Sequence, residues 1–154
     1  MDDVWCLADL GGGQLLSGSF DRSLWVWNTA TRACLAVVPN AHGTGVLDSI
    51  SAACALPGGA ATGSWGCTVQ QWKWDEGAST LTPDGAALQM EKTNLIMAYS
   101  LAAAPGPDGV LQLLAGGEDG ALQVLAIGTD GELQQQAELA GHSHWVKAVT
   151  LMRP

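Results

Sequence analysis

The sequence predicts an all-β fold made of about three repeats of four short strands. The main sign is a turn, Gly18-Ser19-Phe20-Asp21, that returns at 63–66 and, more weakly, at 117–120, each time before an apolar strand. The turn position moves from residue 21 to 66 and then to 119, intervals of 45 and 53 residues. A period of this length is typical of the blades of a β-propeller, whose faces are buried only when neighbouring blades stack.

The first unit, about residues 1–40, reads as four strands separated by turns rich in Gly, Asp and Asn. The expected strands are 4–10, 14–19, 23–28 and 33–38. Leu24 and Val26 share one face of the third strand, and Trp25 and Trp27 share the other, because side chains alternate along a strand. Large apolar groups on both faces indicate a sheet that is covered on both sides.

The rest of the chain contains two further units and the start of a fourth. The second unit, about 41–92, has expected strands at 49–56, 60–64, 68–74 and 87–91, with a polar loop at 75–85. The third unit, about 93–140, has expected strands at 95–103, 110–116, 121–127 and 133–139. Residues 141–154 include an apolar segment, 145–152, that reads as the first strand of a fourth unit. Residues 1–154 are thus predicted to form one propeller segment.

Composition excludes several classes of partner. The chain has 47% hydrophobic and 14% charged residues and a net charge of −9, and its six basic residues are scattered. Nucleic acids and anionic membranes require clustered Lys and Arg, so neither partner is expected. No apolar run reaches the length of about 18 residues that a membrane span needs. The acidic start and four widely spaced cysteines favour an intracellular protein, in the cytoplasm rather than the nucleus.

The repeats resemble the WD-repeat β-propeller family. The resemblance is carried by 17–21 with Trp25-Val26-Trp27-Asn28, and by Gly141-His142 before an apolar segment, and it covers most of the chain. In that family a His before the first strand, a Ser or Thr in the second, an Asp in the tight turn and a Trp in the third share hydrogen bonds. The first repeat matches these positions with Ser17, Asp21 and Trp27, but no His precedes it.

No repeat carries the complete network. The second repeat has His42, Thr62 and Trp72, with Gly66 at the Asp position. The third repeat has Asp119, but Leu125 replaces the Trp, and His142 belongs to the fourth unit. An Asp without these partners, if buried, would need other donors, such as backbone amides.

The number of units raises the question of ring closure. Members of the family usually close a ring of about seven blades, and three and a fraction do not close alone. The favoured explanation is a segment of a longer propeller. The alternatives are pairing with a second copy or another chain that supplies the missing blades, and a compact arc that stands alone.

The resemblance implies a protein-interaction scaffold or adaptor without catalysis of its own. Phe20, Trp65 and Glu118 occupy the tight-turn position that in the family lies on the top face and often touches partners. Aromatic residues at such a place suit a binding hot spot. With His144 and Trp145 they form the expected partner-binding rim, for a protein partner whose identity the sequence does not give.

Other functions have weaker support. A small-molecule or glycan-binding module would stack its ligand on exposed tryptophans such as Trp65 or Trp145. An enzyme would need converging acids, bases or a metal at the propeller channel, and the sequence shows no such set. His142 and His144 could share one strand face, but no third ligand of fitting spacing appears, so no metal or other cofactor is expected.

Overall fold

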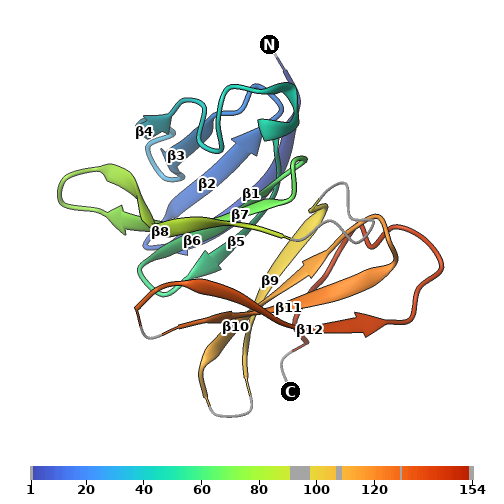
Figure 1. The fold of residues 1–154 in the computed structure, drawn as a ribbon. Coiled ribbons are helices and arrows are strands. Elements are labelled where there is room, and N and C mark those ends of the chain that lie inside the picture. The colour runs from blue at the N-terminus through green and yellow to red at the C-terminus, as the bar shows by residue number, and fades with distance from the viewer. Residues whose placement is uncertain (1, 91–97, 107–108, 129, 153–154) are drawn as a thin grey trace.

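The computed structural model describes residues 2–90, 98–106, 109–128 and 130–152. In this part of the chain, strands form three four-stranded antiparallel sheets that follow one another in chain order (Figure 1). Blade 1 contains β1 (Val4–Gly11), β2 (Gln14–Ser19), β3 (Leu24–Asn28) and β4 (Cys34–Val38). Blade 2 contains β5 (Ile50–Leu56), β6 (Gly59–Ser64), β7 (Thr68–Asp75) and β8 (Thr80–Gln89). Blade 3 contains β9 (Ser100–Pro105), β10 (Leu111–Gly116), β11 (Ala121–Ile127) and β12 (Leu133–Ala140).

This architecture confirms the predicted all-β fold of four-stranded antiparallel units. Each sheet is a meander in which consecutive strands pair, and the first strands, β1, β5 and β9, pack against one another from blade to blade. One 3-10 helix, η1 (Val46–Asp48), joins blades 1 and 2. No helix in the described residues is long and apolar enough to cross a membrane.

Two apolar cores fill the spaces between the blades. Between blades 1 and 2, residues such as Leu16, Leu24 and Val26 of blade 1 pack against Ile50 and Trp72 of blade 2. The core between blades 2 and 3 includes the following residues: Val69, Met90, Leu101, Leu113 and Leu125. Blade 2 is therefore covered on both faces.

The expectation that blade 1 is covered on both faces is wrong for one of them. The face of Leu24 and Val26 is buried, whereas Trp25 and Trp27 on the other face are only half-buried and stack on each other.

Glycine permits a close approach between successive units of the chain. A Cβ atom at Gly18 would lie 2.6 Å from Ile50 Cγ2, one at Gly63 would lie 2.9 Å from Ala98 Cβ, and one at Gly116 would lie 2.8 Å from Val146 Cγ1. Gly18 and Gly63 are the second-to-last residues of β2 and β6, and Gly116 is the last residue of β10, so all three lie at the end of the second strand of their blades. Val146 thus packs on blade 3 in the way that Ile50 packs on blade 1.

The segment predicted as the first strand of a fourth unit forms no strand in its described part, residues 141–152. A strand requires a hydrogen-bonded neighbour, and here single bonds to blade 3 take the place of a ladder. The Val146 amide donates to Gly117 O at 2.8 Å, and Ser100 Oγ donates to Val146 O at 3.2 Å. The segment is anchored at Val146 but is otherwise irregular.

The fourth strand of blade 2 differs from its prediction. The loop expected at 75–85 is shorter, because β8 begins at Thr80 and pairs with β7 along most of its length. Pro83 lies within this strand, opposite Trp72. Proline is tolerated there because an outermost strand need not donate every N–H to a neighbour. The expected end of this strand at Glu91 and the expected start of the next strand at Leu95 lie outside the described residues.

Candidate functional site

The candidate site lies at one end of the blades. In these antiparallel meanders, the turn between the second and third strands lies at the same end as the start of the first strand. At this end Trp5, Ser51, Tyr99 and Lys147 occupy equivalent places at the start of successive units, 46, 48 and 48 residues apart. Trp5 and Ser51 fall where the registers of β1 and β5 shift, and such bulges redirect a side chain.

These four residues line a single cavity of about 460 Å³, which we call the rim cavity. Its remaining lining residues are Trp65 and Glu118, from the turns of blades 2 and 3, and Trp145. Residues from all three blades and from the segment after β12 therefore meet at one site. Trp5 and Trp145 remain 45% and 52% exposed, so the cavity offers aromatic surface to solvent.

Aromatic contacts organise the rim cavity into two groups. Trp65 makes edge-to-face contacts with Trp5, at 5.7 Å between ring centroids, and with Phe20, at 5.0 Å. Tyr99 and Trp145 stack with their centroids 5.4 Å apart. The Lys147 ammonium nitrogen lies 5.0 Å from the centroid of the Trp145 ring, a distance typical of a cation–π contact.

One carboxylate lies among these rings. The Tyr99 hydroxyl donates a hydrogen bond of 3.0 Å to Glu118 Oε1. Partial burial and the neighbouring Glu118 charge raise the pKa of Tyr99 to about 12. At neutral pH the phenol therefore stays protonated and keeps donating to the carboxylate. The indole N–H of Trp65 is buried and has no hydrogen-bond acceptor among the described residues.

The structure brings together most of the residues expected at the rim. Trp65, Glu118 and Trp145 line the same cavity, and Phe20 packs against Trp65. His144 is exposed and is not among the lining residues. Sequence reasoning missed the four residues at the starts of the units, although their near-constant spacing was a usable signal. The four places carry a Trp, a Ser, a Tyr and a Lys, and this difference in residue type obscured their equivalence.

In blade 2, the expected network residues form one hydrogen-bonded chain. His42 Nε2 and the Trp72 indole N–H each lie 2.7 Å from Thr62 Oγ1, and His42 Nδ1 lies 2.7 Å from Thr68 Oγ1. Thr68 thus supplies the partner that the Gly66 position lacks. Burial lowers the pKa of His42 to about 4, so its ring is neutral at physiological pH.

The other two blades keep parts of the network. In blade 1 the Trp27 indole donates to Ser17 Oγ at 2.9 Å. Asp21 is exposed. Its Oδ1 accepts a hydrogen bond of 2.9 Å from the Ser23 amide and one of 2.5 Å from the Ser23 hydroxyl. The bond from the Ser23 hydroxyl is the main cause that lowers the pKa of Asp21.

In blade 3, Asp119 Oδ1 accepts from the Ala121 amide at 2.9 Å. Leu125, at the Trp position, is fully buried. His142 is exposed, and its amide donates to Gly120 O at 3.3 Å. These contacts stabilise turns and cores. The rim cavity, in contrast, presents exposed aromatic rings and a carboxylate.

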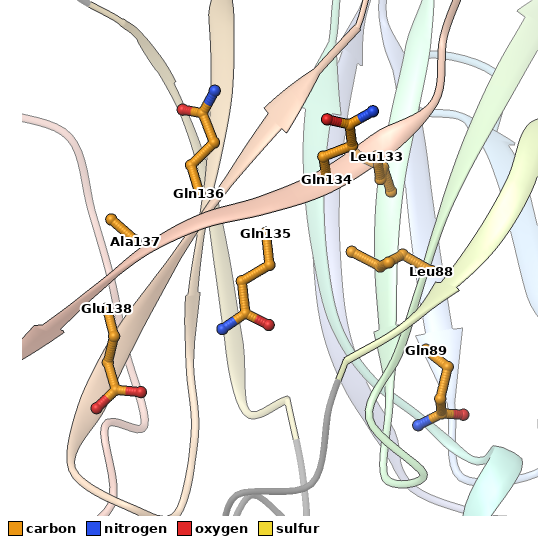
Figure 2. Close-up of a pocket in the computed structure, with 8 residues that line it drawn as sticks. All are labelled: Leu88, Gln89, Leu133, Gln134, Gln135, Gln136, Ala137 and Glu138. Atoms are coloured by element: carbon orange, nitrogen blue, oxygen red, sulfur yellow. The ribbon is translucent and has the colours of Figure 1, made fainter.

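A second, larger space lies between the outermost strands of blades 2 and 3. It measures about 600 Å³ and is lined by Leu88 and Gln89 of β8 and by residues 133–138 of β12. Figure 2 shows Gln135 and Glu138 on one side of β12 and Gln134 and Gln136 on the other. Gln135 donates to Gln123 at 2.6 Å, which in turn donates to Glu138 at 3.0 Å, so these polar groups already satisfy one another.

Neither space contains a metal-binding set. Within the described ranges, no three His, Cys, Asp or Glu side chains gather closely enough to hold an ion.

No family model and no curated protein matches the sequence. Among solved structures, the crystal structure of the RRP9 WD40 repeats matches with a TM-score of 0.71 and 17% sequence identity. The match covers 96% of this chain and 42% of the RRP9 chain, so this chain spans less than half the length of that structure. The resemblance to WD repeats is thereby confirmed at the level of the fold: the three blades described here have the WD40-type β-propeller fold.

Proposed function

We propose that this chain is a protein-interaction module of the scaffold or adaptor type, without catalysis of its own, and that its partner binds over the rim cavity. The observation that carries the proposal is the meeting of four aromatic side chains and one carboxylate at a single open cavity. Trp and Tyr dominate the binding energy of many interfaces, because they bury large apolar areas while their polar atoms can still form hydrogen bonds.

The geometry also favours a rigid recognition surface. Each lining residue comes from a strand start, from a tight turn or from the segment anchored at Val146. Trp65 is held between Phe20 and Trp5, so little conformational freedom is lost when a partner covers it. An intracellular, cytoplasmic location is part of the proposal, and the exposed thiol of Cys34 is compatible with a reducing compartment.

The test is selection of binding peptides from a displayed library of random sequences, followed by affinity measurement. We expect selected peptides to lose at least about tenfold in affinity for the Trp65→Ala and Trp145→Ala variants, the usual effect of truncating a hot-spot residue. Leu139→Ala is the matched control, because Leu139 is 53% exposed, like Trp145 at 52%, but lies in β12 and does not line the cavity. Its affinity should equal that of the unchanged chain.

Two outcomes would count against the proposal. Selected peptides that bind both rim variants normally would place the binding surface elsewhere. Failure to select any peptide, together with glycan binding that is lost in Trp65→Ala, would instead favour the alternative of a glycan-binding module that stacks sugars on exposed tryptophans.

A further inference from the structure

We propose that the rim cavity recognises a cationic side chain of the partner, that of lysine, methylated lysine or arginine, and that Lys147 occupies this place in the free protein. The inference rests on the proposed function, since it names the chemistry that the partner presents to the same cavity.

A cation already lies at the cavity in the free protein. The Lys147 ammonium is 5.0 Å from the Trp145 ring centroid, and both residues line the cavity. The faces of aromatic rings carry negative electrostatic potential and attract ammonium and guanidinium groups within about 6 Å. Tyr99 stacks on the same Trp145 ring, and Trp5 and Trp65 supply further aromatic surface.

The position of Glu118 also favours a cationic ligand. Its carboxylate lines the cavity and accepts one hydrogen bond, from the Tyr99 hydroxyl. A carboxylate has about four acceptor positions, so it can also accept from an incoming ammonium or guanidinium group. Aromatic rings with a carboxylate among them suit a cation better than a neutral sugar, which needs several hydrogen-bonding side chains, and much better than an anion.

Acidic residues outnumber basic residues around the cavity. The described loops at this end of the blades contribute these acidic residues besides Glu118: Asp2, Asp3, Asp21, Asp48 and Asp119. The basic residues of the same loops are Arg22 and Lys147. The chain as a whole carries a net charge of −9, which attracts basic partners and repels phosphorylated or sulfated ones.

Lys147 is exposed, so a partner can displace its ammonium group without unfolding the site. An exposed cation–π contact changes affinity by about two- to fivefold, which makes Lys147 a weak internal competitor. A partner would therefore have to bind the rim cavity with a higher affinity than Lys147 does.

The experiment uses choline chloride and its uncharged carbon analogue, 3,3-dimethylbutan-1-ol, as probes of nearly equal shape. Binding is followed through the NMR signals of the tryptophan indole N–H groups, assigned by single Trp variants. We expect choline to shift the signals of Trp5, Trp65 and Trp145 and to leave that of the buried Trp72 unchanged. The uncharged analogue should bind at least about tenfold more weakly.

Charge variants complete the test. Lys147→Met should strengthen choline binding by about two- to fivefold, and Glu118→Gln should weaken it by a similar factor. Lys73→Met and Glu132→Gln are the controls, since both residues are exposed and lie at the opposite end of the blades. They change the same charges but should leave binding at the rim unaltered.

Equal binding of the charged and uncharged probes at the rim indoles would overturn the inference while leaving the proposed function intact. The same conclusion would follow if the selected peptides bound the rim without Lys or Arg and without any effect of Lys147→Met. If neither the probes nor any peptide shifted the rim indoles, both proposals would fail.

Discussion

The indole Nε1 of Trp74 donates a hydrogen bond of 2.5 Å to Gln14 Oε1, and this bond joins blade 2 to blade 1. The same amide donates through Nε2 to Glu76 Oε1 at 2.6 Å. Gln14 is only 5% exposed, so one buried side chain uses both its donor and its acceptor to link two blades. Apolar packing sets the distance between the blades, and directional bonds of this kind also set their register.

We expect Gln14→Leu to lower the free energy of unfolding by about 1–3 kcal/mol, because it leaves the Trp74 indole N–H without its acceptor. Urea unfolding followed by tryptophan fluorescence measures this change. Gln112→Leu is the control, since Gln112 donates to Gln136 within blade 3 at an exposed position. That variant should change stability by less than about 0.5 kcal/mol. Equal effects of the two substitutions would mean that the Gln14 bond adds nothing to blade association.

Stability should also fall in mild acid because of His42. Burial is the main cause that lowers the pKa of His42 to about 4 from its ordinary 6.5, and the nearby Asp48 charge opposes this shift. Between these two pH values the unfolded chain binds a proton that the folded chain does not. The free energy of unfolding should therefore decrease as the pH falls from about 6.5 to about 4, by up to about 3 kcal/mol, and this contribution is constant above pH 7.

The measurement is a series of urea unfolding curves between pH 7.5 and pH 4, compared among variants. His42→Gln should be less stable at neutral pH, because it breaks the chain to Thr62 and Thr68, but its stability should depend less on pH in this range. His144→Gln, at an exposed position, should keep the pH profile of the unchanged chain. If the profile of His42→Gln were the same as that of the unchanged chain, His42 would not be the titrating group.

The strands were predictable wherever apolar alternation and turn residues agreed. The predicted ranges 14–19 and 121–127 coincide with β2 and β11. The prediction failed in β8, because Pro83-Asp84-Gly85 has the composition of a turn, whereas the long β7 strand supplies partners for Asp84 and its neighbours. Local residue preference was overridden there by pairing with a strand that lies earlier in the chain.

The site was predictable only in part. Phe20, Trp65 and Glu118 could be found because they share one turn position in the repeats, and repeat logic compares like positions. The role of Thr68 could not be found in this way, because it replaces the missing Asp from a position two residues beyond Gly66. Such a substitution within a polar network is visible only when the side chains are placed in space.

Close packing between blades gives a further prediction, at Gly18. A methyl group there would lie 2.6 Å from Ile50 Cγ2 and 2.7 Å from Cys6 Sγ, and Ile50 is fully buried and has little space to move. Gly18→Ala should therefore lower the free energy of unfolding by about 1–3 kcal/mol through overpacking. The control is Gly141→Ala, because a Cβ atom at Gly141 would meet nothing within 4 Å. If urea unfolding showed that the Gly18→Ala variant is as stable as the unchanged chain, the packing between blades 1 and 2 would leave room for a methyl group at this position.

Thiol reactivity provides an independent measure of the same packing. Cys34 is exposed on β4, whereas burial raises the pKa values of both Cys6 and Cys54 to about 12. Only about one in ten thousand thiols with such a pKa is ionised at pH 8, and the thiolate is the form that reacts. Iodoacetamide at pH 8 should therefore modify Cys34 long before Cys6 or Cys54, as read by peptide mass spectrometry. In concentrated urea the difference should disappear. Rapid modification of Cys6 in the folded chain would show that blade 1 opens away from Ile50, since Cys6 packs against the core between the first two blades.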